Sequence, residues 1–202
     1  MEKITRLRKL LRKEFIDGYI IPKNDEFFGE YISSDKDRLK YISNFSGSYG
    51  FALILKNKNY LFVDGRYTLQ AKRESGKFFE IITFPGKMLN NITMGKKLSI
   101  GFDPKLFTNK ILYTFFSNTN HKFKPIKKNL IDQIWKRKFK KKINKFYRLP
   151  NTSTDINYKS KIKKVIQNLK KTGADYQFIT ASENNAWLLN IRGGDAEYTP
   201  IT

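Results

Sequence analysis

The chain has 202 residues and a formal net charge of +22, because 40 Lys and Arg residues stand against 18 Asp and Glu residues. A hydrophobic fraction of 40% is typical of globular proteins and excludes a chain that is disordered as a whole. The chain contains no Cys, which excludes a disulfide framework and a thiolate metal site.

No apolar run is long enough to cross a bilayer, and the charged amino terminus lacks the apolar core of a signal peptide. We therefore expect a cytoplasmic protein without a membrane partner. Only nine of the 40 basic residues are Arg, although phosphate and base contacts favour Arg. We expect no specific nucleic-acid partner, and a basic nucleic-acid-binding protein remains the least favoured of three interpretations.

The first 135 residues predict alternating helices and strands. Apolar residues from Ile4 to Phe15 recur at helical spacing, and a strand follows at 19–21. Residues 41–45 lead into a predicted glycine-punctuated turn at 46–50, before a β-hairpin of strands 51–55 and 60–63. The remaining predicted elements are a helix at 67–74, a strand at 79–83, a loop at Pro85 and Gly86, a strand at 98–102, a helix at 108–117, a strand at 122–126 and a helical turn at 131–135. This order predicts an α/β fold with a mixed β-sheet flanked by helices.

The pattern then begins again. A basic run at 136–142 and turn-like residues at 151–155 predict a linker, for which a solvated strap and a nucleic-acid or localisation patch are the two interpretations. A second amphipathic helix at 162–169 is capped by Gly173, and a strand is predicted at 175–181. Two pairs of segments can be aligned, which are 17–21 with 175–179 and 41–47 with 187–193, and both members of the second pair are predicted as an apolar turn followed by Asn and Gly.

This internal repeat predicts two domains of one fold. We expect a first domain at 1–140, a linker at 141–155 and an incomplete second domain at 156–202. One helix and one strand leave an apolar face and a sheet edge uncovered, so we expect the second segment to fold only with further sequence or a partner.

The strand that ends at Val63 leads into Asp64-Gly65-Arg66-Tyr67. Gly65 predicts a turn with positive φ, which would place the Arg66 guanidinium at the junction, where it could hold a carboxylate or a carbonyl edge. The alternative is that Asp64 and Arg66 form only a local ion pair that fixes the corner.

The chain shows no catalytic constellation. Its single His, His121, lies in a polar, Lys-rich segment, and we interpret it as a surface residue. Because a metal-hydrolase site needs several His, Asp and Glu ligands in fixed geometry, we expect neither catalytic residues nor metal ligands in this chain.

The Asp64-Gly65-Arg66-Tyr67 stretch, followed by Leu69-Gln70-Ala71, resembles a motif in the amino-terminal domain of Xaa-Pro aminopeptidases (aminopeptidase P), members of the creatinase or pita-bread metallopeptidase superfamily. Other stretches that resemble the family occur in its order, and they are 19–22 with Asp25, 30–32, Arg38, 43–50, 101–104, 129–135 and 186–195. Phe27 stands where relatives commonly have His, and Asn44 stands where they often have Gly.

The resemblance implies a creatinase amino-terminal fold in the first domain and the start of the same fold in the second, with the catalytic pita-bread domain absent. The family's activity is release of an amino-terminal residue that precedes proline, at a pair of divalent metals, typically manganese, in that absent domain. The amino-terminal domains of the family support dimerisation and limit access to short Xaa-Pro peptides.

By the same resemblance, Arg66, Arg192 and Asp195 are the positions that border the substrate or another domain. An interdomain ion pair is the alternative role of Arg192 and Asp195. The implied partners are the missing catalytic domain or a catalytic subunit, and a second copy in a homodimer. A stand-alone binding or assembly module, which pairs with a separate catalytic half, is the second interpretation.

Overall fold

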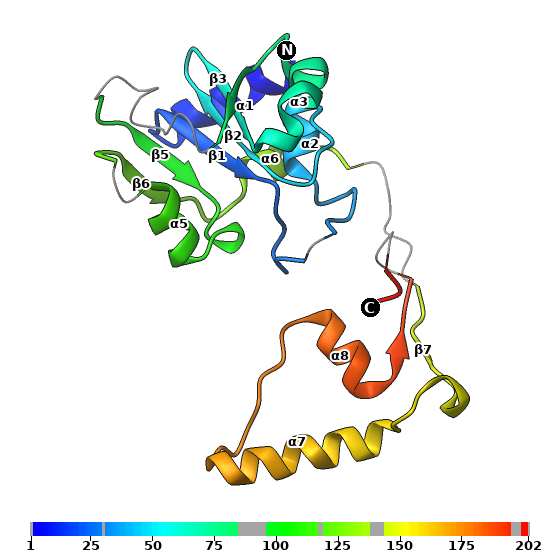
Figure 1. Ribbon diagram of the computed structural model, residues 1–202. Coiled ribbons are helices and arrows are strands. Elements are labelled where there is room, and N and C mark those ends of the chain that lie inside the picture. Colours follow the sequence, from blue (N-terminus) through cyan, green and yellow to red (C-terminus); the bar gives the residue numbers. More distant parts are fainter. Residues whose placement is uncertain are drawn as a thin grey trace. The chain divides into compact units, whose positions relative to one another are not determined.

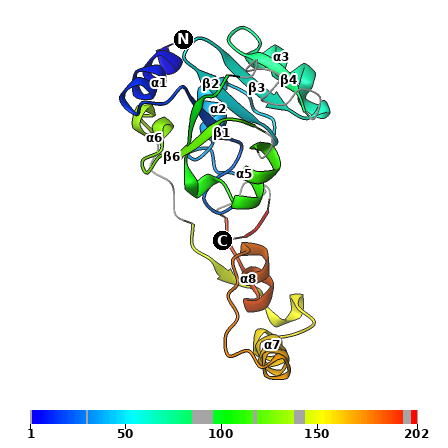
Figure 2. The ribbon, with the colours of Figure 1, turned by 90° about the vertical axis from the view of Figure 1, so that its left-hand side faces the viewer.

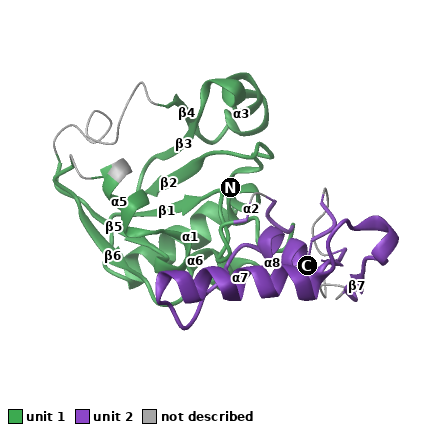
Figure 3. Cartoon of the chain, turned by 60° about the horizontal axis from the view of Figure 1, so that its bottom comes forward, with its two compact units in different colours: residues 1–28, 34–139 green, residues 29–33, 140–202 purple. Residues whose placement is uncertain are grey.

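The computed structural model describes residues 2–29, 31–84, 96–116, 119–137, 144–194 and 199–201. The chain divides into two compact units (Figure 3). Unit 1 comprises Met1–Phe28 and Ser34–Phe139, and unit 2 comprises Gly29–Ser33 and Lys140–Thr202.

Unit 1 is built on a six-stranded sheet with the strand order β4-β3-β2-β1-β5-β6 (Figure 1). β2 is antiparallel to both of its neighbours, whereas the other adjacent strands pair in parallel, so the sheet is mixed. The strands are β1 Gly18–Pro22, β2 Phe51–Leu55, β3 Asn59–Val63, β4 Glu80–Thr83, β5 Ser99–Phe102 and β6 Lys122–Pro125.

Helices cover both faces of this sheet (Figures 1 and 2). One face packs against α1 Glu2–Lys13, α2 Arg38–Ser43, α3 Thr68–Ser75 and α6 Leu130–Ile134. The other face packs against the 3-10 helix η2 Pro104–Leu106 and α5 Asn109–Phe116. In β1, Tyr19 and Ile21 point into the first core and Ile20 into the second, and each is 1% exposed. The predicted mixed α/β fold is confirmed.

The predicted strands and longer helices of unit 1 are confirmed to within two residues at each end. The apolar turn predicted before Asn44 is wrong, because the short helix α2 occupies 38–43. The Asp37 carboxylate accepts the backbone N–H of Lys40 at 3.0 Å and caps the start of α2, and Asn44 ends it in the left-handed conformation with φ 66°. The predicted loop at Pro85 and Gly86 lies outside the described residues.

A buried guanidinium holds the segment between β1 and α2 in place. Arg38 is 3% exposed and binds the Asp132 carboxylate through two atoms, Nε to Oδ1 at 2.8 Å and a terminal nitrogen to Oδ2 at 2.9 Å. It also reaches Glu26 Oε1 at 2.7 Å. Burial alone would raise the pKa of Glu26, but hydrogen bonds from its own backbone N–H, Lys36 and Arg38 lower that pKa to about 2.

The described residues of unit 2 form two α-helices, a short 3-10 helix and a two-stranded sheet. Its elements are β7 Tyr147–Arg148, the 3-10 helix η3 Asn151–Ser153, α7 Tyr158–Thr172, α8 Ser182–Leu189 and β8 Ile191–Arg192. The α7 helix and its cap are confirmed, since the helix ends at Gly173 with φ 69°. The turn expected at 187–191 is instead the end of α8 followed by β8, with Asn190 left-handed between them at φ 53°.

The predicted strand at 175–181 is wrong for the described structure, in which these residues form neither strand nor helix. A strand needs a neighbour for its backbone N–H and C=O groups, and no described strand pairs with this segment. Its aromatic side chains are open to solvent, with Tyr176 and Phe178 each 91% exposed. Among the described apolar side chains of unit 2, only that of Ala186 is buried.

The Arg38 cluster generates a stability prediction. Arg38→Ala leaves the Glu26 and Asp132 carboxylates with one fewer cation at a partly buried position, and we expect the free energy of unfolding to fall by about 2–4 kcal/mol. Urea unfolding measures this change. The matched control is Arg6→Ala, which removes an exposed pair with Glu2 and should change the free energy by less than about 0.5 kcal/mol. Equal effects of the two substitutions would contradict the prediction.

Candidate functional site

The corner after β3 presents Arg66 to solvent. Asp64 caps the 3-10 helix η1 Gly65–Tyr67, and its Oδ1 accepts the backbone N–H of Arg66 at 2.9 Å. The Arg66 guanidinium returns to the same carboxylate, with a terminal nitrogen 2.7 Å from Oδ2, and this hydrogen bond lowers the pKa of Asp64. The Arg66 side chain is 73% exposed. The predicted local ion pair is therefore present, and an exposed pair of this kind contributes little to stability.

Gly65 does not have the positive φ predicted from the sequence. Among the described glycines, only Gly50 and Gly173 have positive φ. A Cβ added at Gly65 would meet no heavy atom within 4 Å. Neither backbone conformation nor packing within the described residues therefore requires glycine here, and open space lies beside Arg66.

The loop at 46–50 is fixed against this corner by side-chain hydrogen bonds. The backbone N–H and hydroxyl of Ser46 both donate to the Glu74 carboxylate, each at 2.8 Å. The Ser48 and Tyr67 hydroxyls lie 2.7 Å apart, and Gln70 donates to the Ser46 hydroxyl at 2.8 Å. We call this exposed polar surface the β3 corner; it comprises Ser46, Ser48, Asp64, Gly65, Arg66, Tyr67 and Gln70. Sequence reasoning identified the corner but missed its contacts to the loop.

The β3 corner lies at the carboxyl ends of parallel strands. Val63 of β3 pairs in register with Thr83 of β4, and the Thr68 and Thr83 hydroxyls are 3.0 Å apart. The corner thus combines an exposed guanidinium, hydroxyl groups and open space at the carboxyl ends of β3 and β4.

The other two predicted site residues belong to unit 2. Arg192 lies in β8, is half-buried, and donates to the carbonyl oxygens of Ala186 at 3.2 Å and Ile191 at 2.8 Å. It therefore supports the carboxyl end of α8. Asp195 lies outside the described residues, so its predicted ion pair with Arg192 stays a prediction.

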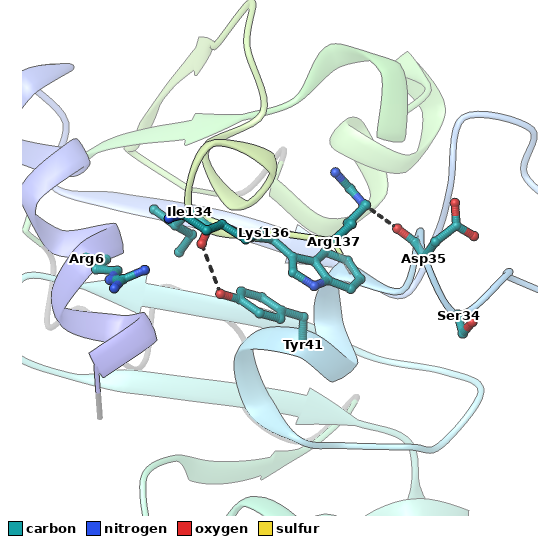
Figure 4. A pocket seen from close by; sticks show the side chains of 8 residues that line it. Arg6, Ser34, Asp35, Tyr41, Ile134, Lys136 and Arg137 are labelled. Carbon is teal, nitrogen blue, oxygen red and sulfur yellow. Dashed lines mark hydrogen bonds between the residues drawn. The ribbon is translucent and has the colours of Figure 1, made fainter. Parts of the chain in front are cut away.

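A hollow of about 350 Å³ in unit 1 was not predicted (Figure 4). The Tyr41 and Trp135 rings stack with centroids 4.6 Å apart, and the Arg137 guanidinium lies 4.6 Å from the Trp135 ring. Arg137 Nε donates to the backbone oxygen of Asp35 at 2.6 Å, and the Tyr41 hydroxyl donates to that of Ile134 at 3.2 Å. The residues that line the hollow thus contact one another, which indicates a structural role for the hollow and not a ligand site.

The described residues do not form a metal centre. Among them, no group of three or more His, Cys, Asp or Glu side chains could hold a metal ion, so the described residues do not fit a di-metal site. No helix within the described ranges is both long enough and apolar enough to span a membrane. His121 is half-buried rather than fully exposed, and its Nδ1 accepts the backbone N–H of Leu98 at 3.2 Å.

Gly47, in the loop at 46–50, and Gly65, in the β3 corner, give opposite predictions. A Cβ at Gly47 would lie 2.2 Å from the buried ring of Phe45 and 2.8 Å from that of Tyr67, so Gly47→Ala should cost about 1–3 kcal/mol of unfolding free energy. Gly65→Ala is the matched control and should change that free energy by less than about 0.5 kcal/mol. Thermal or urea unfolding measures both, and a large loss from Gly65→Ala would show that the space beside Arg66 is filled.

His121 gives a pH prediction. Burial lowers the pKa of His121, and because the folded pKa lies below the unfolded value of about 6.5, its contribution to stability is complete above that pH. The contribution is lost as the pH falls through the folded pKa. An NMR titration can follow this single imidazole, and a folded pKa at or above 6.5 would contradict the prediction.

Comparisons with known proteins agree with this fold. Residues 3–134 match the family model of the creatinase/prolidase N-terminal domain, and residues 137–202 match a second model with the same description. The chain is 30% identical over 210 residues to a probable Xaa-Pro aminopeptidase P of Coprinopsis cinerea, which covers 99% of this chain and 34% of the relative. Xaa-Pro aminopeptidase 1 of Dictyostelium discoideum is also 30% identical, with 99% of this chain and 35% of the relative covered.

Among solved structures, the X-prolyl aminopeptidase of Caenorhabditis elegans, described as a cytosolic enzyme with a di-nuclear active site, matches with a TM-score of 0.85 at 26% identity. The match covers 99% of this chain and 36% of that one. A Xaa-Pro dipeptidase of Bacillus anthracis shares the fold over 66% of this chain and 35% of its own, with a TM-score of 0.52 at 24% identity.

The chain spans about a third of the length of the curated relatives that it matches. The resemblance predicted from the motifs is confirmed over nearly the whole chain. By the match of residues 3–134, the chain belongs to the creatinase/prolidase N-terminal domain family.

Proposed function

We propose that this chain is the amino-terminal portion of a Xaa-Pro aminopeptidase-like metallopeptidase and is not catalytic alone. The observation that carries the proposal is the match to aminopeptidases P over 99% of the chain, which amounts to about a third of each relative. The parent activity would be release of an amino-terminal residue that precedes proline. We assign catalysis and the divalent metal, manganese by resemblance, to a catalytic domain or subunit, because the described residues do not fit a metal centre.

In this proposal, the β3 corner borders the peptide. Arg66 is exposed, and its fork-shaped guanidinium can hold a carboxylate or carbonyl group through two hydrogen bonds. The open space at Gly65 leaves room for such a group. We also assign Arg192 and Asp195 to the border with the substrate or with another domain. The hydrogen bond of Arg192 to the backbone oxygen of Ala186 in α8 fixes the position of its side chain.

The same proposal includes support of a homodimer, restriction of access to short Xaa-Pro peptides, and location in the cytoplasm. The domain limits that we propose are 1–140 for the first domain, 141–155 for the linker and 156–202 for the incomplete second domain. A stand-alone assembly module that pairs with a separate catalytic half is the second candidate. Unit 2 favours it, because the described part of that unit buries almost no apolar side chain.

The proposal predicts that the purified chain does not cleave a Xaa-Pro tripeptide at any manganese concentration. The measurement is release of the first residue, with an intact aminopeptidase P as the positive control. Manganese-dependent cleavage by the chain alone would contradict the proposal.

A chimera tests the role of Arg66. Residues 1–202 are joined to the part of the C. elegans X-prolyl aminopeptidase that follows its matched portion, and KM is measured for a Xaa-Pro tripeptide. Arg66→Ala should raise KM about tenfold or more, because a two-point charged contact to the substrate is lost. Arg73→Ala on α3 is the matched control and should leave KM unchanged. An unchanged KM for Arg66→Ala would remove Arg66 from the site.

A further inference from the structure

The two ends of the six-stranded sheet differ in charge. Every strand except β2 begins at one end, and the described segments there are 13–17, 56–58, 76–79, 96–98 and 119–122. We call this surface the amino edge. Its charged residues are seven Lys and two acids, namely Lys13, Lys56, Lys58, Lys77, Lys96, Lys97, Lys122, Glu14 and Asp17. All seven Lys residues are exposed, so the amino edge is strongly basic.

The opposite end of the sheet, which carries the β3 corner, is nearly neutral. Its described segments are 23–28, 44–50, 64–67, 103–108 and 126–129, and they contain five basic residues and four acids. The positive charge of the chain is therefore not spread evenly over unit 1. Like charges that gather at one edge repel one another, and a negatively charged partner would relieve this repulsion.

Hydrogen bonds join the segments of the amino edge into one surface. The Asp17 carboxylate accepts the backbone N–H of Ser99, at the start of β5, at 2.9 Å, and it accepts the Lys56 ammonium at 2.6 Å. A backbone hydrogen bond of 2.8 Å joins the segment before β5 to the start of β6. An amide-to-carbonyl hydrogen bond of 2.9 Å joins the start of β3 to the segment before β4.

Phe15 lies at the amino edge, in the turn that precedes the central strand β1. Its residue is 88% exposed, the highest value among the described large apolar residues of unit 1. The turn itself is fixed, since Ile16 is 1% exposed and Lys124 Nζ donates to the Glu14 backbone oxygen at 2.8 Å. The fixed turn therefore holds the Phe15 ring out in solvent.

The backbone of Phe15 is also unfavourable for its residue type. Its φ is 53°, in the left-handed region where bulky residues are rare and where helices commonly end in glycine. The helix α7 ends in this common way, at Gly173 with φ 69°. A glycine at position 15 would remove both the backbone strain and the exposed ring, so folding does not explain the phenylalanine. Contact of the ring with a partner would explain it.

We propose that the amino edge is a contact surface for an anionic phospholipid membrane, with the Phe15 ring inserted among the headgroups. All seven cations are Lys, whose ammonium group is a point charge that suits a diffuse layer of negative charge. A bilayer accepts an inserted ring without a preformed pocket. Such a contact needs no membrane-spanning helix, and it differs from the sequence-based expectation of no membrane partner.

The number of exposed rings favours a membrane over a nucleic acid. Proteins that bind single-stranded nucleic acid stack successive bases on several aromatic side chains along a groove. Among its described residues, the amino edge exposes only one aromatic ring, that of Phe15.

The membrane surface does not rest on the proposed function. The β3 corner lies at the opposite ends of the strands, so the two surfaces can be occupied at the same time. The cytoplasmic leaflet of a membrane is anionic, which agrees with the proposed location in the cytoplasm.

Sedimentation of the full chain with lipid vesicles tests this proposal. Vesicles of phosphatidylcholine alone are compared with vesicles that also contain phosphatidylserine. We expect the chain to bind the phosphatidylserine vesicles about tenfold more tightly or better, and we expect this binding to weaken as salt is added. Equal binding to the two kinds of vesicle would overturn the proposal.

Variants locate the contact. Phe15→Gly should weaken vesicle binding about fivefold or more without lowering the unfolding temperature, because glycine suits the left-handed backbone, and Phe15→Trp should retain binding. Lys97→Glu combined with Lys122→Glu should weaken binding about tenfold or more. The matched control, Lys105→Glu combined with Lys128→Glu, makes the same change of charge at the opposite end of the sheet and should weaken binding less than about threefold.

The other outcomes also decide the proposal. Unchanged binding of Phe15→Gly, or equal losses from the two double substitutions, would overturn it. Tighter, Phe15-dependent binding to a single-stranded oligonucleotide would overturn it in favour of a nucleic acid. Loss of vesicle binding in the chimera that tests Arg66 would show that the catalytic part covers the amino edge, and would overturn it too. A chimera that binds vesicles but cleaves no Xaa-Pro peptide would support the membrane surface while counting against the proposed function.

Discussion

Pairing of β1 along both of its edges is the constraint on which unit 1 depends. The strand joins the antiparallel β2 to the parallel β5, and its side chains enter the cores on both faces of the sheet. The helices of unit 1 pack on those cores, and the Arg38 cluster holds the segment that follows β1. The β3 corner depends on the same sheet, because its loop and helix meet at the carboxyl ends of β3 and β4.

The sequence was sufficient where structure is local or where the partner strands lie in the same unit. Helical periodicity predicted α1 and α7, and each described strand of the sheet in unit 1 was predicted to within two residues at each end. It failed at 175–181, because a strand also requires a neighbour and sequence pattern does not report one. It also failed at α2 and α8, because a short helix that ends in a left-handed Asn has the same residue types as a turn.

In the candidate site, too, local contacts could be predicted from the sequence and long-range contacts could not. The Asp64–Arg66 pair was predictable because the two residues are two positions apart and both side chains lie at one corner. The bonds from Ser46 to Glu74 and from Ser48 to Tyr67 join residues 28 and 19 positions apart, and no sequence signal links them. Gly65 was misread because glycine serves both for positive φ and for open space, and only its surroundings distinguish the two.

A lysine contact that joins two helices occurs at aligned positions of the two units. Lys161 places an ammonium group at the carboxyl end of α8, where helix carbonyls are unsatisfied and a positive charge is favourable, and Lys3 does the same for α2. This polar contact joins α1 to α2 in unit 1 and α7 to α8 in unit 2, and in neither unit does it involve the six-stranded sheet.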